Sequence, residues 1–204
     1  MNRINQKGIK IAAIVVFLLS ASCAPPPKID LLYRAPRQTE GLKGKSLFLR
    51  VEDERTSKDM IGRGAKKDFA EFPGNVYFEV AKGYDEGSKI GVYEIPQACY
   101  EAFKIKLESM GIVVATDKAN AQAEIVISLK EFMLDLQRRT WKAYMAYEAS
   151  LIKDGKVYAT ENINGQAERF KVFRLREANI VVSEIFTDIV NKLDIEKLLK
   201  KSEL

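Results

Sequence analysis

Histidine is absent from this chain of 204 residues, and cysteine occurs only twice, as Cys23 and Cys99. Without histidine the chain cannot build a Ser-His-Asp triad or a zinc-binding HExxH helix, and most other zinc sites are excluded as well. The sequence therefore predicts no metal site, and no motif in it predicts a cofactor.

A long hydrophobic run is also missing. The apolar segment Ile11–Leu19 is too short to cross a bilayer core of about 30 Å as a helix. It follows a basic segment without acidic residues, Met1–Lys10, and precedes the small residues Ser20, Ala21 and Ser22. This succession is typical of a secretory signal peptide. We therefore expect residues 1–22 to be a signal peptide that is not part of the fold.

The residue after this segment is a cysteine. The stretch Leu19-Ser20-Ala21-Ser22-Cys23 resembles the lipobox of bacterial lipoproteins, although Ser20 stands where that motif usually has a large apolar residue. The resemblance implies that Cys23 becomes the mature N-terminus and carries lipid. Several acyl chains would hold the protein at a membrane. Ordinary cleavage after Ser22 and an uncleaved anchor are the alternatives.

Removal of the leader changes the charge balance. The whole chain has 33 basic and 28 acidic residues, and the leader contains three of the basic ones, so the mature chain has a net charge of +2. No basic face stands out, and we expect no nucleic-acid partner. Lipid on Cys23 would leave Cys99 alone, which excludes an internal disulfide. Cys99 shares a helical apolar face with Phe103 and Leu107 and is expected to be a core thiol.

The remaining chain divides into a lipidated cysteine with a proline-rich tether, residues 23–40, and a single globular domain, residues 41–204, with a long loop at 56–91. Strands are expected at 45–51, 112–115, 123–136, 141–152 and 157–166, and helices at 96–110 and 175–193. This order predicts an α/β (α+β) sandwich. Its sheet is mixed, mostly antiparallel and of four to five strands, with two main helices packed on it.

No catalytic motif is present. Asp53 and Glu54 could act as an acid and a base, but the alternative is a solvated strand end with a local Asp53–Arg55 pair. Gly62-Arg63-Gly64 lacks the lysine and the strand-to-helix context of a phosphate-binding loop. We therefore expect a protein that is not an enzyme.

Aromatic residues supply the candidate partner contacts. Tyr77, Phe78 and Tyr84 lie in the loop at 56–91, and loops of this length are usually functional or mobile. The core elements do not need this loop, so a tolerated surface insertion is the alternative. A second candidate is the aromatic hairpin around Trp141, whose side chains would otherwise belong to the core.

The mature chain resembles the YajG-type family of uncharacterised envelope lipoproteins. The resemblance rests on the lipobox cysteine with its prolines, a strand ending in Asp53-Glu54-Arg55, the stretch Met60-Ile61-Gly62, a helix closing at Met110-Gly111-Ile112, the strand Ala123–Leu129, a hairpin and a terminal amphipathic helix.

This resemblance implies a Gram-negative envelope protein without catalysis. Ala24 after the cysteine implies the periplasmic face of the outer membrane. The expected function is a non-enzymatic binding or assembly accessory of an envelope complex, with membrane contact through lipid on Cys23 and a protein partner. The alternative is a lipid-anchored periplasmic enzyme that acts on cell wall or lipid.

Overall fold

The computed structural model describes residues 26–83, 85–173 and 175–201. The predicted leader, Cys23 and Tyr84 lie outside the described residues. The strands are β1 (Asp30–Ala35), β2 (Ser46–Asp53), β3 (Val76–Lys82), β4 (Ser88–Tyr93), β5 (Val113–Ala115), β6 (Ala123–Gln137), β7 (Thr140–Lys153) and β8 (Lys156–Phe170). The helices are α2 (Ile95–Ser109), the short 3₁₀ turn η1 (Lys118–Asn120), α3 (Arg176–Lys192) and α4 (Ile195–Lys200).

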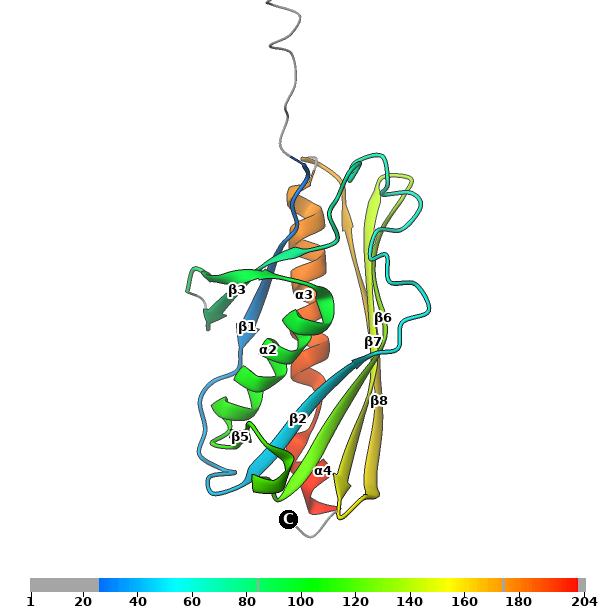
Figure 1. The fold of residues 1–204 in the computed structure, drawn as a ribbon. Coiled ribbons are helices and arrows are strands. Elements are labelled where there is room, and N and C mark those ends of the chain that lie inside the picture. Colours follow the sequence, from blue (N-terminus) through cyan, green and yellow to red (C-terminus); the bar gives the residue numbers. More distant parts are fainter. Residues whose placement is uncertain (1–25, 84, 174, 202–204) are drawn as a thin grey trace, which may run out of the picture.

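The strands form two sheets, where the sequence predicted one (Figure 1). The larger sheet has the order β5-β2-β6-β7-β8 and matches the predicted mixed sheet. In it β2 runs parallel to β5 and β6, and the other pairs are antiparallel. The smaller sheet has the order β1-β3-β4, with β1 parallel to β3. The fold is therefore mixed α+β with two sheets and two main helices.

The meander of β6, β7 and β8 follows the sequence pattern closely. Alternate residues of β7 are buried from Trp141 to Leu151, as a period of two requires. Asp154 and Gly155 have φ values of 52° and 74°, which both central residues of a type I′ hairpin turn need. β6 contains a bulge between Leu129 and Glu131, where the pairing with β7 shifts register.

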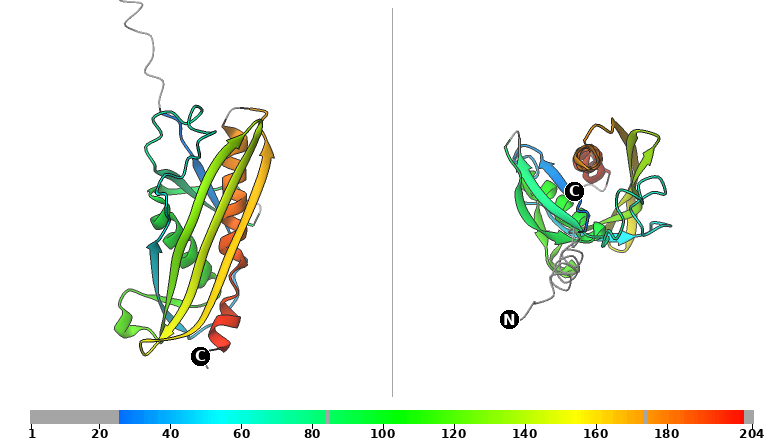
Figure 2. Two further views of the ribbon diagram at one scale, coloured as in Figure 1. Left: turned by 90° about the vertical axis from the view of Figure 1, so that its right-hand side faces the viewer. Right: turned by 90° about the horizontal axis from the view of Figure 1, so that it is seen from above.

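Helix α3 joins the two sheets. It lies between β1 and β8, and Figure 2 (right) shows it end-on in the gap between the two curved layers. The ring of Phe186, on this helix, packs edge-on against Tyr33 of β1, Phe78 of β3 and Phe132 of β6. The distances between ring centroids are 6.1, 6.2 and 5.9 Å. One aromatic side chain thus closes the core at the junction.

Helix α2 lies over the other part of the core. Pro96 stands in its first turn, where a missing N–H costs nothing. Its Phe103 packs on Tyr147 of β7, with ring centroids 5.2 Å apart. The Tyr147 hydroxyl donates to the Ile189 carbonyl of α3 at 2.9 Å. The two helices are therefore tied to the same strand. No helix in the described part of the chain is long and apolar enough to cross a membrane.

Parts of the predicted tether and of the predicted long loop belong to the core, which corrects the expectations for both segments. Ile29, Leu31 and Tyr33 are fully buried, so β1 shortens the tether of residues 23–40. In the loop at 56–91, the residues Met60, Ile61, Ala65, Phe69, Val76, Phe78 and Ala81 are buried. The expectation that the core does not need this loop is wrong, because it supplies both the β3–β4 hairpin and a packed irregular segment.

The irregular segment lies along β6. Leu134 of β6 exchanges backbone hydrogen bonds with Met60 and Gly62, at 2.7 and 2.8 Å. Gly64 approaches so closely that a Cβ there would lie 1.9 Å from the Leu136 carbonyl oxygen. Glycine is needed for this close approach, which explains the Gly62-Arg63-Gly64 stretch without a bound phosphate.

Candidate functional site

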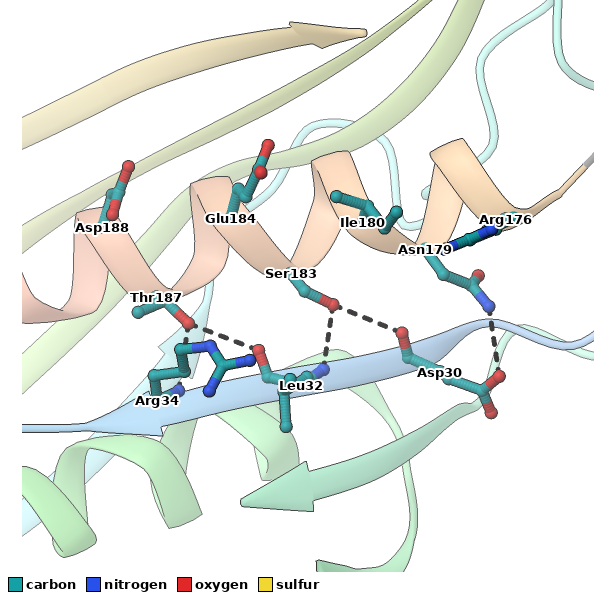
Figure 3. A pocket seen from close by; sticks show the side chains of 10 residues that line it. All are labelled: Asp30, Leu32, Arg34, Arg176, Asn179, Ile180, Ser183, Glu184, Thr187 and Asp188. Carbon is teal, nitrogen blue, oxygen red and sulfur yellow. Dashed lines mark hydrogen bonds between the residues drawn. The ribbon is translucent and has the colours of Figure 1, made fainter. Parts of the chain in front are cut away.

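A row of polar side chains on α3 lines the edge of β1 (Figure 3). Asn179, Ser183, Thr187 and Asn191 recur every fourth residue, and Figure 3 draws the first three of them along the side of the helix that faces β1. We call these four residues the polar row. A neighbouring face of α3 carries the buried apolar residues that fill the core. The same helix thus packs on both sheets with different chemistry on each side.

The polar row takes the place of a neighbouring strand. The Ser183 hydroxyl accepts from the Leu32 N–H at 2.9 Å and donates to the Asp30 carbonyl at 3.4 Å. The Thr187 hydroxyl accepts from the Arg34 N–H at 3.1 Å and donates to the Leu32 carbonyl at 3.3 Å. An open strand edge is a template for unwanted pairing. Because α3 satisfies its backbone groups, this edge of β1 is closed to strand addition.

The two ends of the row hold β1 by amide side chains. Asn179 Nδ2 donates to a carboxylate oxygen of Asp30 at 3.1 Å, and Asn191 Nδ2 donates to the Arg34 carbonyl at 3.0 Å. Asn191 Oδ1 also accepts from the Tyr33 hydroxyl at 2.9 Å. Burial raises the pKa of this hydroxyl, so Tyr33 stays a donor at neutral pH.

A groove of about 520 Å³ runs along this junction. Its lining comes from both elements: Asp30, Leu32, Arg34, Arg176, Asn179, Ile180, Ser183, Glu184, Thr187 and Asp188. Figure 3 shows Glu184 and Asp188 directed away from β1, on the far side of the helix from the polar row. Apolar side chains with charges of both signs at the margin are typical of a protein-binding surface.

One polar atom in the groove has no partner. Asn179 Oδ1 is buried and accepts no hydrogen bond among the described residues, while its Nδ2 is held by Asp30. An unpaired buried acceptor costs free energy, and because this oxygen is closed off from solvent it is not presented to a ligand. Arg34 is already engaged, since its Nη1 donates to the Gly83 carbonyl at 3.0 Å. What the groove presents to a ligand with N–H donors is the carboxylates of its lining.

The hydroxyls of the groove are poorly placed for nucleophilic chemistry. Ser183 and Thr187 both spend their hydrogen bonds on the β1 backbone rather than on a base. Among the residues that the structure describes, no three His, Cys, Asp or Glu side chains are grouped to hold a metal ion.

Ser183→Ala is expected to lower the free energy of unfolding by about 1–2 kcal/mol, because it removes one acceptor and one donor from the β1 edge. Thr160→Ala is the matched control. Thr160 lies on an exposed face of β8, and its hydroxyl hydrogen-bonds to the Ser150 hydroxyl of β7. We expect less than about 0.5 kcal/mol there. Urea unfolding of both variants checks this, and equal effects would show that the polar row does not hold β1.

The structure does not bring the sequence-predicted contact residues together on a surface. Phe78 and Trp141 are fully buried, which corrects their assignment as partner contacts. Trp141 packs edge-on against Phe69, with centroids 5.9 Å apart, as the core alternative required. Tyr77 is half-buried with Lys28 Nζ 4.8 Å from its ring centre. Cys23 and Tyr84 lie outside the described residues, so their predicted roles stay predictions.

Asp53 and Arg55 form a pair, but not a solvated one. Arg55 Nε and Nη2 each donate to a carboxylate oxygen of Asp53 at 2.9 Å, and Arg55 is only 6% exposed. These hydrogen bonds lower the pKa of Asp53 to about 2. Glu54 points elsewhere, to Lys130. The pair therefore fits a structural role at the end of β2 rather than the acid–base role.

Cys99 is fully buried in α2, which confirms the prediction of a core thiol. Burial raises the pKa of the thiol to about 12, so the reactive thiolate is scarce at neutral pH.

The groove itself was missed by the sequence argument. The sequence predicts a terminal amphipathic helix at 175–193, and its pattern alone gives the polar residues of that helix no role. Their strict spacing of four was the available signal, because short polar side chains in one row can serve a strand edge. That β1 would lie beside them was not visible, since Asp30 and Asn179 are far apart in the chain.

No protein-family model matches the chain, and no curated protein matches it. Similar solved structures include a Xanthomonas campestris protein of family DUF330, with a TM-score of 0.53 and 13% identity over 87% of this chain and 95% of that one.

Two further solved structures are similar. PelC from Paraburkholderia phytofirmans, solved as a dodecamer, has a TM-score of 0.40 and 11% identity over 78% of this chain and 94% of its own. A minor lipoprotein from Acinetobacter baumannii has a TM-score of 0.38 and 10% identity over 76% and 93%.

The Xanthomonas campestris protein shares its fold with this chain, and an identity of 13% shows nothing more. The class that can be stated is therefore an α+β domain with a five-stranded and a three-stranded sheet joined by one helix. The resemblance to the YajG-type family is not confirmed by these neighbours.

Proposed function

We propose that this chain is a lipoprotein of the Gram-negative cell envelope whose domain binds a protein partner and does not catalyse a reaction. Lipid on Cys23 anchors it, and Ala24 after this cysteine favours the periplasmic face of the outer membrane. The observation that carries the proposal is the succession of a basic, an apolar and a small-residue segment that ends at Cys23. The domain begins immediately afterwards, with β1 at Asp30.

The short connection supports an anchored domain. Six residues separate Cys23 from Asp30, and the seven Cα–Cα steps between these two residues can span at most about 25 Å. Asp30 is in turn held to α3 through Asn179. The domain would therefore stay close to the membrane surface instead of reaching far into the periplasm.

The groove along β1 and α3 supports the binding role. It joins the apolar side chains of Leu32 and Ile180 to the carboxylates of Glu184 and Asp188. Both groove hydroxyls serve the fold, which argues for recognition over nucleophilic catalysis. A polypeptide segment with N–H donors fits this chemistry.

Photo-crosslinking in living cells tests the binding role. A benzoylphenylalanine at position 180 lies in the groove, and the same group at position 158 lies on an exposed residue of β8 far from it. We expect one discrete protein adduct from position 180 that is absent from position 158. No adduct from position 180, or the same adducts from both positions, would contradict a partner site in the groove.

A further inference from the structure

The connection between β8 and α3 exposes a group of large apolar side chains. Phe170, Val172 and Phe173 are 54, 61 and 64% exposed, and they fall within four consecutive residues. Single exposed apolar residues are common on protein surfaces, whereas a contiguous group marks a contact surface. The described part of the chain therefore leaves more than half of each of these three side chains uncovered.

Basic residues surround this group. Residues 169–176 contain four arginines and lysines and no acidic residue. The β6–β7 turn adds Arg138 and Arg139, which are both exposed. This turn lies beside the connection, because the Lys171 N–H donates to the Arg139 carbonyl at 2.7 Å. The Arg139 guanidinium also lies 5.0 Å from the ring centre of Phe170.

Some of this positive charge is compensated. Lys171 pairs with Asp68 at 2.6 Å, and Arg169 pairs with Glu184 of α3. The exposed arginines of the β6–β7 turn and Arg176 at the start of α3 remain on the surface around the apolar group. We call Phe170, Val172 and Phe173 together with Arg138, Arg139 and Arg176 the basic–aromatic end.

This end of the domain is the one at which the chain enters. Figure 1 shows the start of β1 and the β8–α3 connection at the same end of the molecule, with β5 and the β7–β8 turn at the other. Figure 2 (left) agrees with this arrangement. The contact between Asp30 and Asn179, one turn into α3, places the entering chain beside the helix start. The seven Cα–Cα steps from Cys23 to Asp30 can span only about 25 Å.

We propose that the basic–aromatic end lies against the lipid bilayer. The side chains of Phe170, Val172 and Phe173 would enter the boundary between headgroups and acyl chains, and the arginines would contact anionic lipid phosphates. Aromatic and basic residues are the side chains suited to this boundary. The inference rests on the proposed lipid anchor, and it adds an orientation: the long axis of the domain stands on the membrane, and the β7–β8 turn points away.

Fluorescence quenching in vesicles tests this orientation. The full-length protein is purified with its native N-terminus and reconstituted into phosphatidylethanolamine and phosphatidylglycerol vesicles whose acyl chains are brominated. An environment-sensitive label is attached at Phe173→Cys, or at Val157→Cys as the matched control, which is 55% exposed at the opposite end. Cys99 is buried and does not compete for the label. We expect brominated lipid to reduce the signal at position 173 by about half and to leave position 157 unchanged.

The failures of the two proposals are distinguishable. Mass spectrometry of the same preparation reports whether Cys23 carries lipid, and its absence would overturn the anchor. With lipid present, an unquenched label at position 173 would overturn the orientation. A label at position 173 that is shielded only when an envelope protein is added would assign this end to a protein partner and would also overturn it.

Discussion

Asp53→Ala is expected to lower the free energy of unfolding by about 3 kcal/mol or more at neutral pH, because it leaves a buried guanidinium without its counter-charge. Arg55 is 6% exposed, and Asp53 accepts hydrogen bonds from its Nε, its Nη2 and its backbone N–H. The remaining Nη1 is buried without a partner, so the guanidinium has no second acceptor in place. We place the expected loss at the lower end of the range for buried pairs, since the Asp53 side chain is 21% exposed.

The control is the adjacent carboxylate. Glu54 also pairs with a base, Lys130, but both side chains are exposed by more than 40%. Glu54→Ala is expected to cost far less than Asp53→Ala, because water and salt screen an exposed pair. Urea unfolding at pH 7 compares the two variants. Equal losses would contradict the view that the buried position of Arg55, and not ion pairing as such, sets the size of the effect.

The same pair predicts a pH dependence. The folded protein holds the pKa of Asp53 at about 2, below its ordinary value of 3.8. A carboxyl whose pKa is lowered by folding stabilises the folded state above its ordinary pKa, and this contribution is lost as the pH falls through the folded value. The difference in unfolding free energy between the wild type and Asp53→Ala should therefore shrink between about pH 4 and pH 2. A difference that stays constant over this range would contradict the assignment.

Lys106→Met is expected to cost about 3 kcal/mol, because it removes the donor that satisfies the last carbonyl groups of α3. Lys106 lies in the last turn of α2 and is 4% exposed. Its Nζ donates to the carbonyls of Val190 and Asn191, each at 3.0 Å, and to that of Leu193. Burial lowers the pKa of this ammonium to about 8, so it still carries its proton at neutral pH.

Methionine keeps the length and the apolar stem of the lysine, and so the loss reports the hydrogen bonds more than the packing. Lys104→Met on the same helix is the matched control, since Lys104 is 41% exposed and lies 4.0 Å from Glu108. Its expected effect is within about 0.5 kcal/mol. Thermal and urea unfolding of both variants provide the comparison. A loss below 1 kcal/mol for Lys106→Met would contradict a clamp between the helices.

Local patterns predicted the parts of this fold that local chemistry determines. The strands expected at 141–152 and 157–166 and the helix expected at 175–193 each follow from the pattern of one short segment, and β7, β8 and α3 confirm them. The helix cap at Asp194 is also a local feature, since its carboxylate accepts from the Lys197 N–H at 2.9 Å.

The second sheet could not be predicted in the same way. β1 lies in a proline-rich segment and pairs in parallel with β3, whose Phe78 stands opposite Leu31 across a long stretch of chain. Parallel pairing needs such a crossover, and nothing in either segment alone names the partner. The irregular segment around Met60 and Phe69 was missed for a related reason, because its burial follows no helical or strand period.

The candidate site depends both on a local pattern and on contact between distant segments. The spacing of Asn179, Ser183 and Thr187 is visible in the sequence, but its meaning depends on β1 lying beside α3. The partner contacts predicted from aromatic content failed at Phe78 and Trp141, since aromatic side chains on strands fill the core first.

The intact mass of the protein purified from membranes tests the central claim most directly. We expect a mature chain that begins at Cys23. Its mass should exceed the mass calculated from its sequence by a diacylglyceryl group and an additional acyl chain on the amino group. Cys23→Ser should lose this added mass and Cys99→Ser should keep it, because Cys99 is buried in α2. A wild-type protein that carries no lipid, or that begins at another residue, would contradict the account.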